Sequence, residues 1–178
     1  MDNLKDNQWQ AVDGIVDEII YESQRPKILW VLREPNGENF DFIDYLKDVT
    51  AYPKWKQSYG LVVKISRIIL EGYIHDPREW GVYCPEIMHR IALINIKKTG
   101  GGSTVNWNAL NQAFSENKDM LRDQIQEIDP DYIFCGGTCD YVKDLRLHYP
   151  LICLPHPGQT SMAHNDYIKS ALDQYEAQ

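Results

Sequence analysis

Three polar side chains in this sequence lie at or next to the ends of strongly apolar stretches, where a buried strand would not need them. Glu34 and His156 each come shortly after such a stretch, and Asn95 interrupts a third. Ligands of parallel α/β sheets bind outside the carboxyl ends of the strands, so we expect the three side chains to share one sheet edge. A carboxylate, an amide and an imidazole in one pocket can recognise a planar ring and break a bond next to it.

Glu34 stands between an apolar stretch and Pro35. The proline keeps the backbone of the preceding residue extended, which fixes the place of the Glu34 carboxylate. A carboxylate held at a strand end can orient a water molecule or stabilise a developing cation. The competing interpretation is a surface glutamate, or one that is paired with Arg33.

The Asn95 amide offers both a donor and an acceptor, so its burial requires partners. A ring that carries a carbonyl beside an N–H would satisfy both, although neighbouring loop backbone could do the same. His156 lies between Pro155 and Pro157, which hold it on a rigid turn. A neutral imidazole there can donate a hydrogen bond to a leaving-group oxygen, whereas the competing interpretation is a structural or exposed histidine.

The segment 99–104 is a glycine-rich loop whose backbone N–H groups and two hydroxyls could hold a phosphate. It does not match a Walker motif, and a plain surface loop is an equally good interpretation. Nearby basic residues could form a local basic face, although scattered, solvated side chains are favoured. These residues are Lys54, Lys56, Lys64, Arg67, Lys97 and Lys98. Cys135 and Cys139 lack an evident partner, which argues against a nucleophile or a redox pair.

The composition is that of one soluble domain over residues 1–178, with 43% apolar and 25% charged residues. No apolar run is long enough to cross a membrane and no signal-peptide pattern opens the chain, so we expect a cytoplasmic protein. The four cysteines lack the spacing of a zinc or iron–sulfur site and are predicted to be reduced thiols. The net charge of −8 argues against strong non-specific DNA binding but leaves room for a local basic face.

Strands and helices alternate along the chain, which predicts an α/β fold with a mostly parallel sheet and helices on both faces. Continuous apolar runs predict four strands, at 27–32, 91–96, 132–135 and 151–154. Asn106 is the expected cap of one helix. The helices are predicted at 7–23, around 41–47, from 61 to 72, from 106 onward, at 118–128, after 138 and after 165 or 166.

The order of these motifs resembles the uracil-DNA glycosylase superfamily. Glu34-Pro35 matches its first motif, Leu93-Ile94-Asn95 matches its base-reading strand end, and His156-Pro157 matches its last motif. The resemblance spans most of the chain and implies a three-layer α/β/α sandwich around a central four-stranded, mostly parallel sheet. It also implies that Glu34 positions water, that Asn95 reads the base and that His156 contacts the base oxygen as the base leaves.

The function that the resemblance implies is a monofunctional DNA glycosylase, which hydrolyses the N-glycosidic bond of a flipped uracil or related damaged base. The expected partner is DNA, single- or double-stranded, and the expected form is a monomer with no cofactor, no metal and no membrane contact. The base would be bound by Asn95, Pro35 and Asn36. The phosphate or DNA contacts would be Gly101, Gly102, Ser103, Lys97, Lys98, Gly158 and Gln159.

Some residues depart from the pattern of the superfamily. Arg33 precedes the first motif, Gly158 follows the last one in place of the usual serine, and only Met162 could act as an apolar wedge in the DNA. The aromatic residue that stacks on the base is left open among Phe40, Phe42, Tyr52 and Tyr59. The alternative function is a non-catalytic protein of the same fold that binds a nucleobase, a nucleotide or a protein partner.

Overall fold

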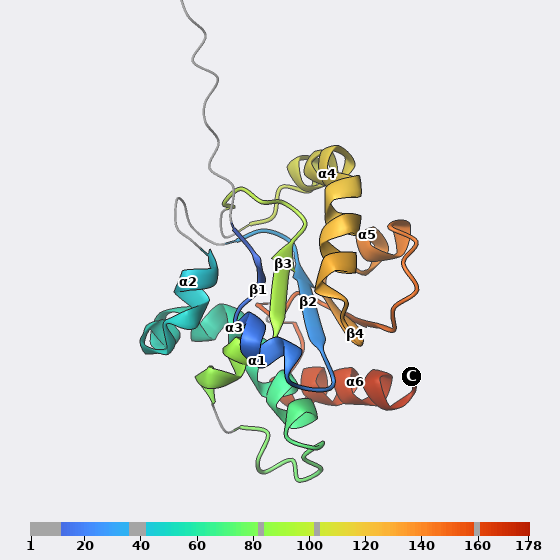
Figure 1. Cartoon of the computed structure of the whole chain (residues 1–178). Helices are drawn as coiled ribbons and strands as arrows, with labels where there is room; N and C mark the ends of the chain where they lie inside the picture. The colour runs from blue at the N-terminus through green and yellow to red at the C-terminus, as the bar shows by residue number, and fades with distance from the viewer. Residues whose placement is uncertain (1–11, 36–41, 82–83, 102–103, 159–160) are drawn as a thin grey trace, which may run out of the picture.

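The computed structural model describes residues 12–35, 42–81, 84–101, 104–158 and 161–178. Its centre is a mostly parallel five-stranded sheet with the strand order β1-β3-β2-β4-β5 (Figure 1). The strands are β1 (Gly14–Ile15), β2 (Ile28–Leu32), β3 (Ala92–Asn95), β4 (Tyr132–Gly136) and β5 (Leu151–Leu154). The four strands expected from the apolar runs are therefore confirmed, and all four are parallel.

The fifth strand, β1, corrects the sequence prediction, which placed residues 7–23 in one helix. Gly14 pairs with Leu93 and Ile15 with Ala92 in an antiparallel edge ladder. Gly14 has a φ of 150°, which is far from helical backbone. Since glycine in a helix interior is unfavourable, the helix begins only after it. Helix α1 (Glu18–Glu22) is capped by Asp17, whose side chain accepts from the backbone N–H of Ile20 at 3.1 Å.

The remaining helices largely follow the apolar spacing of the sequence. They are α2 (Phe42–Lys47), α3 (Tyr52–Leu70), α4 (Trp107–Ile128), α5 (Cys139–Asp144) and α6 (His164–Glu176), with two 3-10 helices, η1 (Val49–Ala51) and η2 (Pro85–Arg90). Asn106 caps α4 as expected, since its side chain accepts from the backbone N–H of Ala109 at 3.1 Å. The two helices predicted after Asn106 are one continuous helix, because no glycine or proline interrupts the segment.

The sheet has a packed core on each face. One core joins Trp30 and Phe134 of the sheet to residues of α3 and α6. Their rings stack with centroids 4.9 Å apart, and the Trp30 indole N–H donates to Ser66 Oγ at 3.0 Å. The other core joins Leu29 and Val31 to residues of α4 and α5, which lie together on one side of the sheet in Figure 1. Successive residues of β2 therefore alternate between the two cores, as strand geometry requires.

The chain reverses its winding direction at β2. It passes from β2 through α3 to β3 on one side, and then from β3 through α4 to β4 on the other side. In sheets of this kind, ligands bind at the carboxyl ends of the strands where the winding direction switches, which here are β2 and β4. The backbone from 33 to 35 follows β2 there, and the backbone from 137 to 138 follows β4.

Among the described residues, no helix is both long enough and apolar enough to span a membrane.

Candidate functional site

Glu34 lies at the switch point, directly beyond β2, with only 11% of its side chain exposed. Its Oε2 atom accepts from Lys97 Nζ at 2.8 Å. The same ammonium donates to the backbone carbonyls of Thr99 at 3.1 Å and Gly100 at 2.9 Å. Lys97 therefore ties the carboxylate beyond β2 to the loop beyond β3, and the pairing of Glu34 with Arg33 that the sequence suggested is replaced by this one.

The surroundings of Gly101 explain why this position of the loop is a glycine. Its backbone N–H donates to the carbonyl of Pro35 at 3.0 Å, which holds the loop against the residues after β2. A Cβ atom at this position would overlap the Glu34 carboxylate. The glycine is therefore required by the close approach of the carboxylate, whether or not the loop also binds a phosphate. Gly102 and Ser103, predicted as phosphate contacts, and Asn36, predicted as a base contact, lie outside the described residues.

Asn95 is buried at the end of β3. Its backbone N–H donates to Asp13 Oδ2 at 2.7 Å, and its side-chain Nδ2 donates to the same oxygen at 3.3 Å. Among the described residues, Asn95 Oδ1 is buried without a hydrogen-bond partner. Asp13 thus fixes which end of the amide is the donor, and the acceptor end is left unsatisfied.

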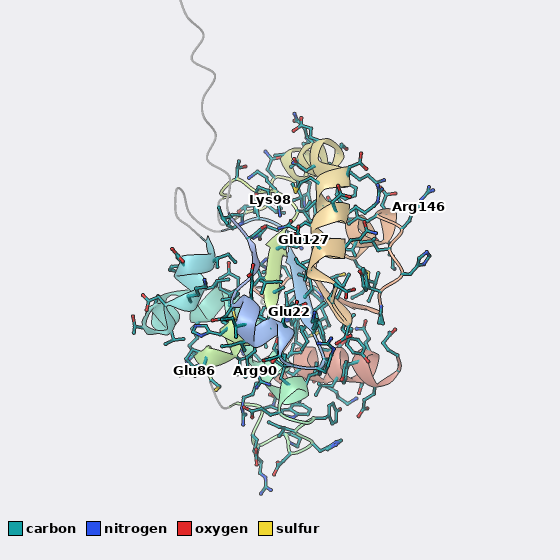
Figure 2. The ribbon with its side chains drawn as sticks, viewed as in Figure 1. Glu22, Glu86, Arg90, Lys98, Glu127 and Arg146 are labelled. Atoms are coloured by element: carbon teal, nitrogen blue, oxygen red, sulfur yellow. A yellow bond between two sulfur atoms is a disulfide. The ribbon has the colours of Figure 1, made fainter. Side chains whose placement is uncertain are left out.

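Asp13 also binds Lys98, which the sequence analysis named as a possible DNA contact. Lys98 Nζ lies 2.7 Å from Asp13 Oδ1 and 2.7 Å from Gln124 Oε1, and only 7% of the Lys98 side chain is exposed (Figure 2). Burial lowers the pKa of Lys98, and the charge of Asp13 opposes that shift. The ammonium is held inside the protein, so it is not placed to bind a phosphate.

The other basic residues of this set also give little support to a local basic face, which was the less favoured interpretation of the sequence. Lys64 is buried, and Arg67 forms an ion pair with Glu71 at 2.9 Å. Lys56 is exposed, and the side chain of Lys54 lies outside the described residues. The favoured interpretation, in which these basic residues do not form one face, describes the structure better.

His156 follows β5 and is held as a neutral hydrogen-bond donor. The backbone N–H of Gly158 donates to His156 Nδ1 at 3.1 Å, so the proton of the neutral ring lies on Nε2. Burial, together with the positive charge of Arg33, lowers the pKa of His156 from 6.5 to about 4. Near pH 7 the ring is therefore uncharged and can donate through Nε2. Gln159, the other residue predicted after this motif, lies outside the described residues.

Arg33 interacts electrostatically with both His156 and Glu34. Its Nε atom donates to the carbonyl of Gly137 at 3.5 Å, and its guanidinium lies 4.8 Å from the centre of the Trp107 ring. Trp107 is the first residue of α4 and is 50% exposed. An arginine beside an exposed aromatic ring is a common surface for nucleic-acid bases and phosphates.

The close packing beyond β4 explains the two glycines of that loop. A Cβ at Gly136 would lie 2.9 Å from Pro157 Cδ, and one at Gly137 would lie 2.7 Å from Arg33 Nη2. Gly137 also has a φ of 73°, which favours glycine. Thr138 closes the turn, since its hydroxyl donates to the carbonyl of Val31 at 2.7 Å. This loop therefore packs closely against the His156 turn and Arg33.

Glu34, Asn95 and His156 lie at or just beyond the carboxyl ends of three parallel strands, β2, β3 and β5. Asn95 pairs in register with Leu32, two residues before Glu34. His156 follows β5, which is separated from β2 by β4. Strands lie about 4.8 Å apart, so the backbones of β2 and β5 are about 10 Å apart. Glu34 and Asn95 therefore belong to neighbouring strands, and His156 follows a strand two positions away from β2.

Two other residues named from the sequence, Tyr59 and Met162, lie in the core or against it. Tyr59, a candidate for stacking on a base, is buried in the core, where burial raises its pKa. Met162, the candidate wedge, is half-buried against the same core. A groove of about 600 Å³ lies along β1 and includes Gln124 and Asp13, the partner of Asn95, in its wall.

The cysteines correct another expectation, since they were predicted to be reduced. Cys139, at the start of α5, forms a disulfide with Cys153 of β5, and their Cα atoms are 5.4 Å apart. Cys84 and Cys135 are free thiols. The spacing of 14 residues matches no common motif, and only the packing of α5 beside β5 brings the two sulfurs together.

Comparison with protein-family models and with curated proteins found no match to the chain.

Proposed function

We propose that the protein is a uracil-DNA glycosylase-like enzyme with an α/β/α sandwich fold, which hydrolyses the N-glycosidic bond of a flipped uracil or related damaged base. The observation that carries the proposal is the state of His156. A neutral imidazole with its proton on Nε2, at the carboxyl edge of a parallel sheet, suits a base that departs with negative charge on its oxygen.

His156 would act by hydrogen bonding rather than by full proton transfer. As the bond between sugar and base breaks, electrons move onto the base, and a carbonyl oxygen attached to its ring gains negative charge. A donor that is already oriented stabilises this charge at little reorganisation cost, and one such donor contributes about 10²–10³ in rate. The Gly158 N–H bond to Nδ1 provides the orientation.

Glu34 would act on the opposite charge. The sugar becomes cationic as the base leaves, by analogy with the hydrolysis of other glycosides. Lys97 binds Glu34 Oε2 and fixes the carboxylate, and Oε1 is the atom that we assign to the attacking water. The pairing also prevents the carboxylate from turning away from the edge of the sheet.

Asn95 would read the base through its unsatisfied oxygen. A buried acceptor without a partner costs about 1–3 kcal/mol, and a ring N–H would remove that cost on binding. Asp13 holds Nδ2, so the amide presents its acceptor in a fixed orientation. A base that lacks the ring N–H would leave the acceptor unsatisfied and would bind less well.

The target base would have to leave the DNA stack, at a cost of a few kcal/mol that is smallest for mismatched or single-stranded DNA. With a net charge of −8 and two lysines held in internal ion pairs, the protein offers few contacts to phosphates. We therefore propose single-stranded and mismatched DNA as the preferred substrates, with affinity that falls as salt rises.

The test is release of free base by the full chain from single-stranded and mismatched DNA that contains uracil. Glu34→Gln keeps the shape of the side chain but removes its charge, and we expect it to lower the rate by about 10²–10⁴. The proposal fails if the wild-type chain releases no base from any damaged substrate, or if Glu34→Gln is as fast as the wild type.

A second candidate function has its own supporting observation. The Glu34 carboxylate is mostly buried, bound by Lys97 and covered by Gly101, so it could serve only to join two loops. The protein would then bind a nucleobase or nucleotide without excision. Measurable affinity for free uracil or a uridine nucleotide, with no DNA binding at low salt, would favour this function over the first.

A further inference from the structure

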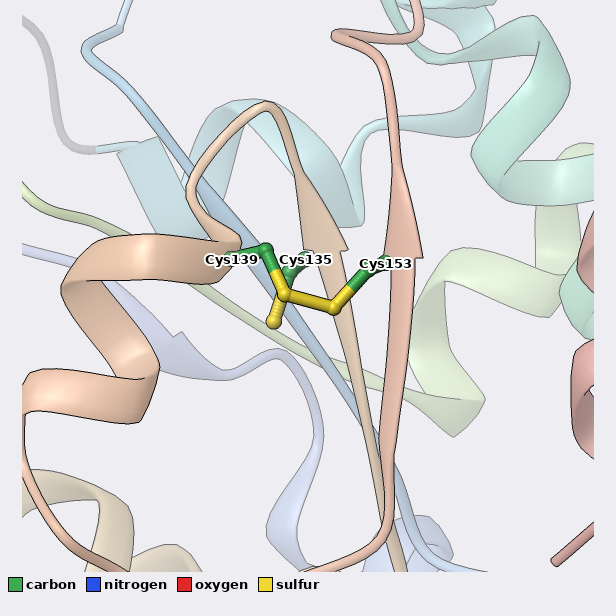
Figure 3. A group of neighbouring side chains, drawn as sticks. All are labelled: Cys135, Cys139 and Cys153. Carbon is green, nitrogen blue, oxygen red and sulfur yellow. A yellow bond between two sulfur atoms is a disulfide. The ribbon is translucent and has the colours of Figure 1, made fainter.

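Three cysteine sulfurs, from β4, α5 and β5, lie close together, although the spacing of the cysteines in the sequence did not predict this cluster. The sulfurs of Cys135, Cys139 and Cys153 are all within 4.8 Å of one another. Figure 3 shows the Cys135 sulfur beside the bond that joins the other two. Cys135 and Cys153 are direct partners in the ladder between β4 and β5, and Cys139 begins α5.

We propose that, when the disulfide is reduced, these three cysteines bind one thiophilic metal cation of the Zn²⁺ type. The site is independent of the proposed glycosylase chemistry and rests on the geometry of the sulfurs alone. It also revises the expectation, drawn from cysteine spacing, that the chain has no zinc site.

The geometry of the sulfurs is close to what zinc requires. Zn–S bonds are about 2.3 Å long, so two sulfurs on a tetrahedral zinc are about 3.8 Å apart. The three sulfurs here lie within 4.8 Å, so small side-chain rotations would complete a three-sulfur site. Cys139 and Cys153 are only partly buried, which gives an ion a route from solvent and leaves room for water as the fourth ligand.

A three-sulfur site would carry a negative charge, which a nearby lysine could offset. Binding of a divalent ion by three thiols releases three protons and leaves one net negative charge on the centre. Lys143, on α5, acts electrostatically on Cys135, and its positive charge would offset the negative charge that remains.

The disulfide and the metal exclude each other, because each needs the sulfurs of Cys139 and Cys153. A dithiol reductant gives two electrons and two protons to the disulfide, closes into its own disulfide and leaves two protein thiols. Only then are three thiols free to lose protons to an ion. Oxidation of the same pair by a small disulfide would release the ion, so the site is expected to exist only under reducing conditions.

The experiment uses the full chain, reduced with a dithiol and then freed of it without oxygen. It is titrated with Zn²⁺ against a coloured chelator, and with Cd²⁺ to detect thiolate-to-metal charge transfer in the ultraviolet. We expect one ion per chain. Cys135→Ala, Cys139→Ser and Cys153→Ser should each weaken binding about tenfold or more, since each removes a ligand. Cys84→Ser is the matched control and should bind as the wild type does.

A readout on the wild-type chain covers the case in which a variant fails to fold. Bound Zn²⁺ should protect Cys135, Cys139 and Cys153 from alkylation, and Cys84 should react at the same rate with and without the ion. The oxidised chain should bind no Zn²⁺ at these sulfurs. The proposal is overturned if the reduced chain binds no ion, if a folded Cys135→Ala variant binds as tightly as the wild type, or if Zn²⁺ fails to protect the three cysteines.

Discussion

Lys97 Nζ lies 2.8 Å from Glu34 Oε2 and so joins the end of β3 to the end of β2. The lysine also binds the carbonyls of Thr99 and Gly100, which folds the loop back over the carboxylate. The residue proposed to position water is therefore fixed by a neighbouring strand rather than by its own loop. The position of the Glu34 carboxylate therefore depends on how closely the loop after β3 can approach it.

Gly101→Ala tests this dependence. The added Cβ would overlap the Glu34 carboxylate, so either the loop or Glu34 must move. We expect a loss of about 1–3 kcal/mol in the free energy of unfolding, as in other overpacked sites. The rate of base release should fall about tenfold or more, because small misplacements of a reacting group are costly. Denaturant unfolding and a base-release assay would measure the two effects.

Gly81→Ala is the matched control for this substitution. A Cβ at Gly81 meets nothing within 4 Å, so both stability and rate should remain close to those of the wild type. Equal effects of the two alanine substitutions, or no effect of Gly101→Ala, would contradict the role given to the loop.

The buried pair of Asp13 and Lys98 predicts a large effect on stability. Asp13→Asn leaves the Lys98 ammonium buried without an opposite charge, which typically costs about 3–5 kcal/mol. The double variant Asp13→Asn, Lys98→Met should recover part of that loss, because the unpaired charge is gone. The free energy of unfolding from urea titrations would measure both.

Asp144→Asn provides a control at the exposed pair of Asp144 and Lys118, which are 2.6 Å apart. Solvent screens such pairs, so little change in stability is expected. An Asp13→Asn variant as stable as Asp144→Asn would show that the buried network does not hold β1 in place.

His156 predicts a pH dependence of stability with a defined direction. Its folded-state pKa of about 4 lies below the ordinary 6.5, so the unfolded chain takes up a proton at pH values where the folded chain does not. The contribution of His156 to stability is therefore full above pH 6.5 and is lost as the pH falls to about 4. After allowance for the partial exposure of the ring, we expect the free energy of unfolding to fall by about 1–3 kcal/mol over this pH range.

Unfolding curves of the wild type and His156→Asn across this pH range would isolate the contribution, since the variant lacks the titrating ring. His164→Asn, at an exposed position on α6, is the control. The same pH dependence in the wild type and in His156→Asn would mean that the ring is not held in its neutral form by the fold.

Much of the sheet could be predicted from the sequence because its signals are local. Each parallel strand is a continuous apolar run, and Asn106 is a favoured cap directly before helical spacing. β1 was missed because it has two residues and is defined only by its pairing with β3. A glycine at position 14 was the one sequence signal that could have ended the predicted helix there.

The predicted site residues were named from local signals, but their partners were not. Asp13 and Lys98 are 85 positions apart, and Cys139 and Cys153 are joined only because α5 packs beside β5. Arg33 lies beside Trp107 of α4, which is distant from it in the sequence. Side-chain type and strand position indicate which residues could act, and packing between distant segments decides which of them are available.

The central claim is that His156 and Glu34 act together on a flipped base, and single-turnover release of uracil from single-stranded DNA tests it most directly. The full chain should release uracil, with a rate that falls by about 10²–10³ in His156→Asn and at least as far in Glu34→Gln. His164→Asn should match the wild type. Release of uracil at equal rates by the wild type, His156→Asn and Glu34→Gln, or no release by any of them, would contradict the claim.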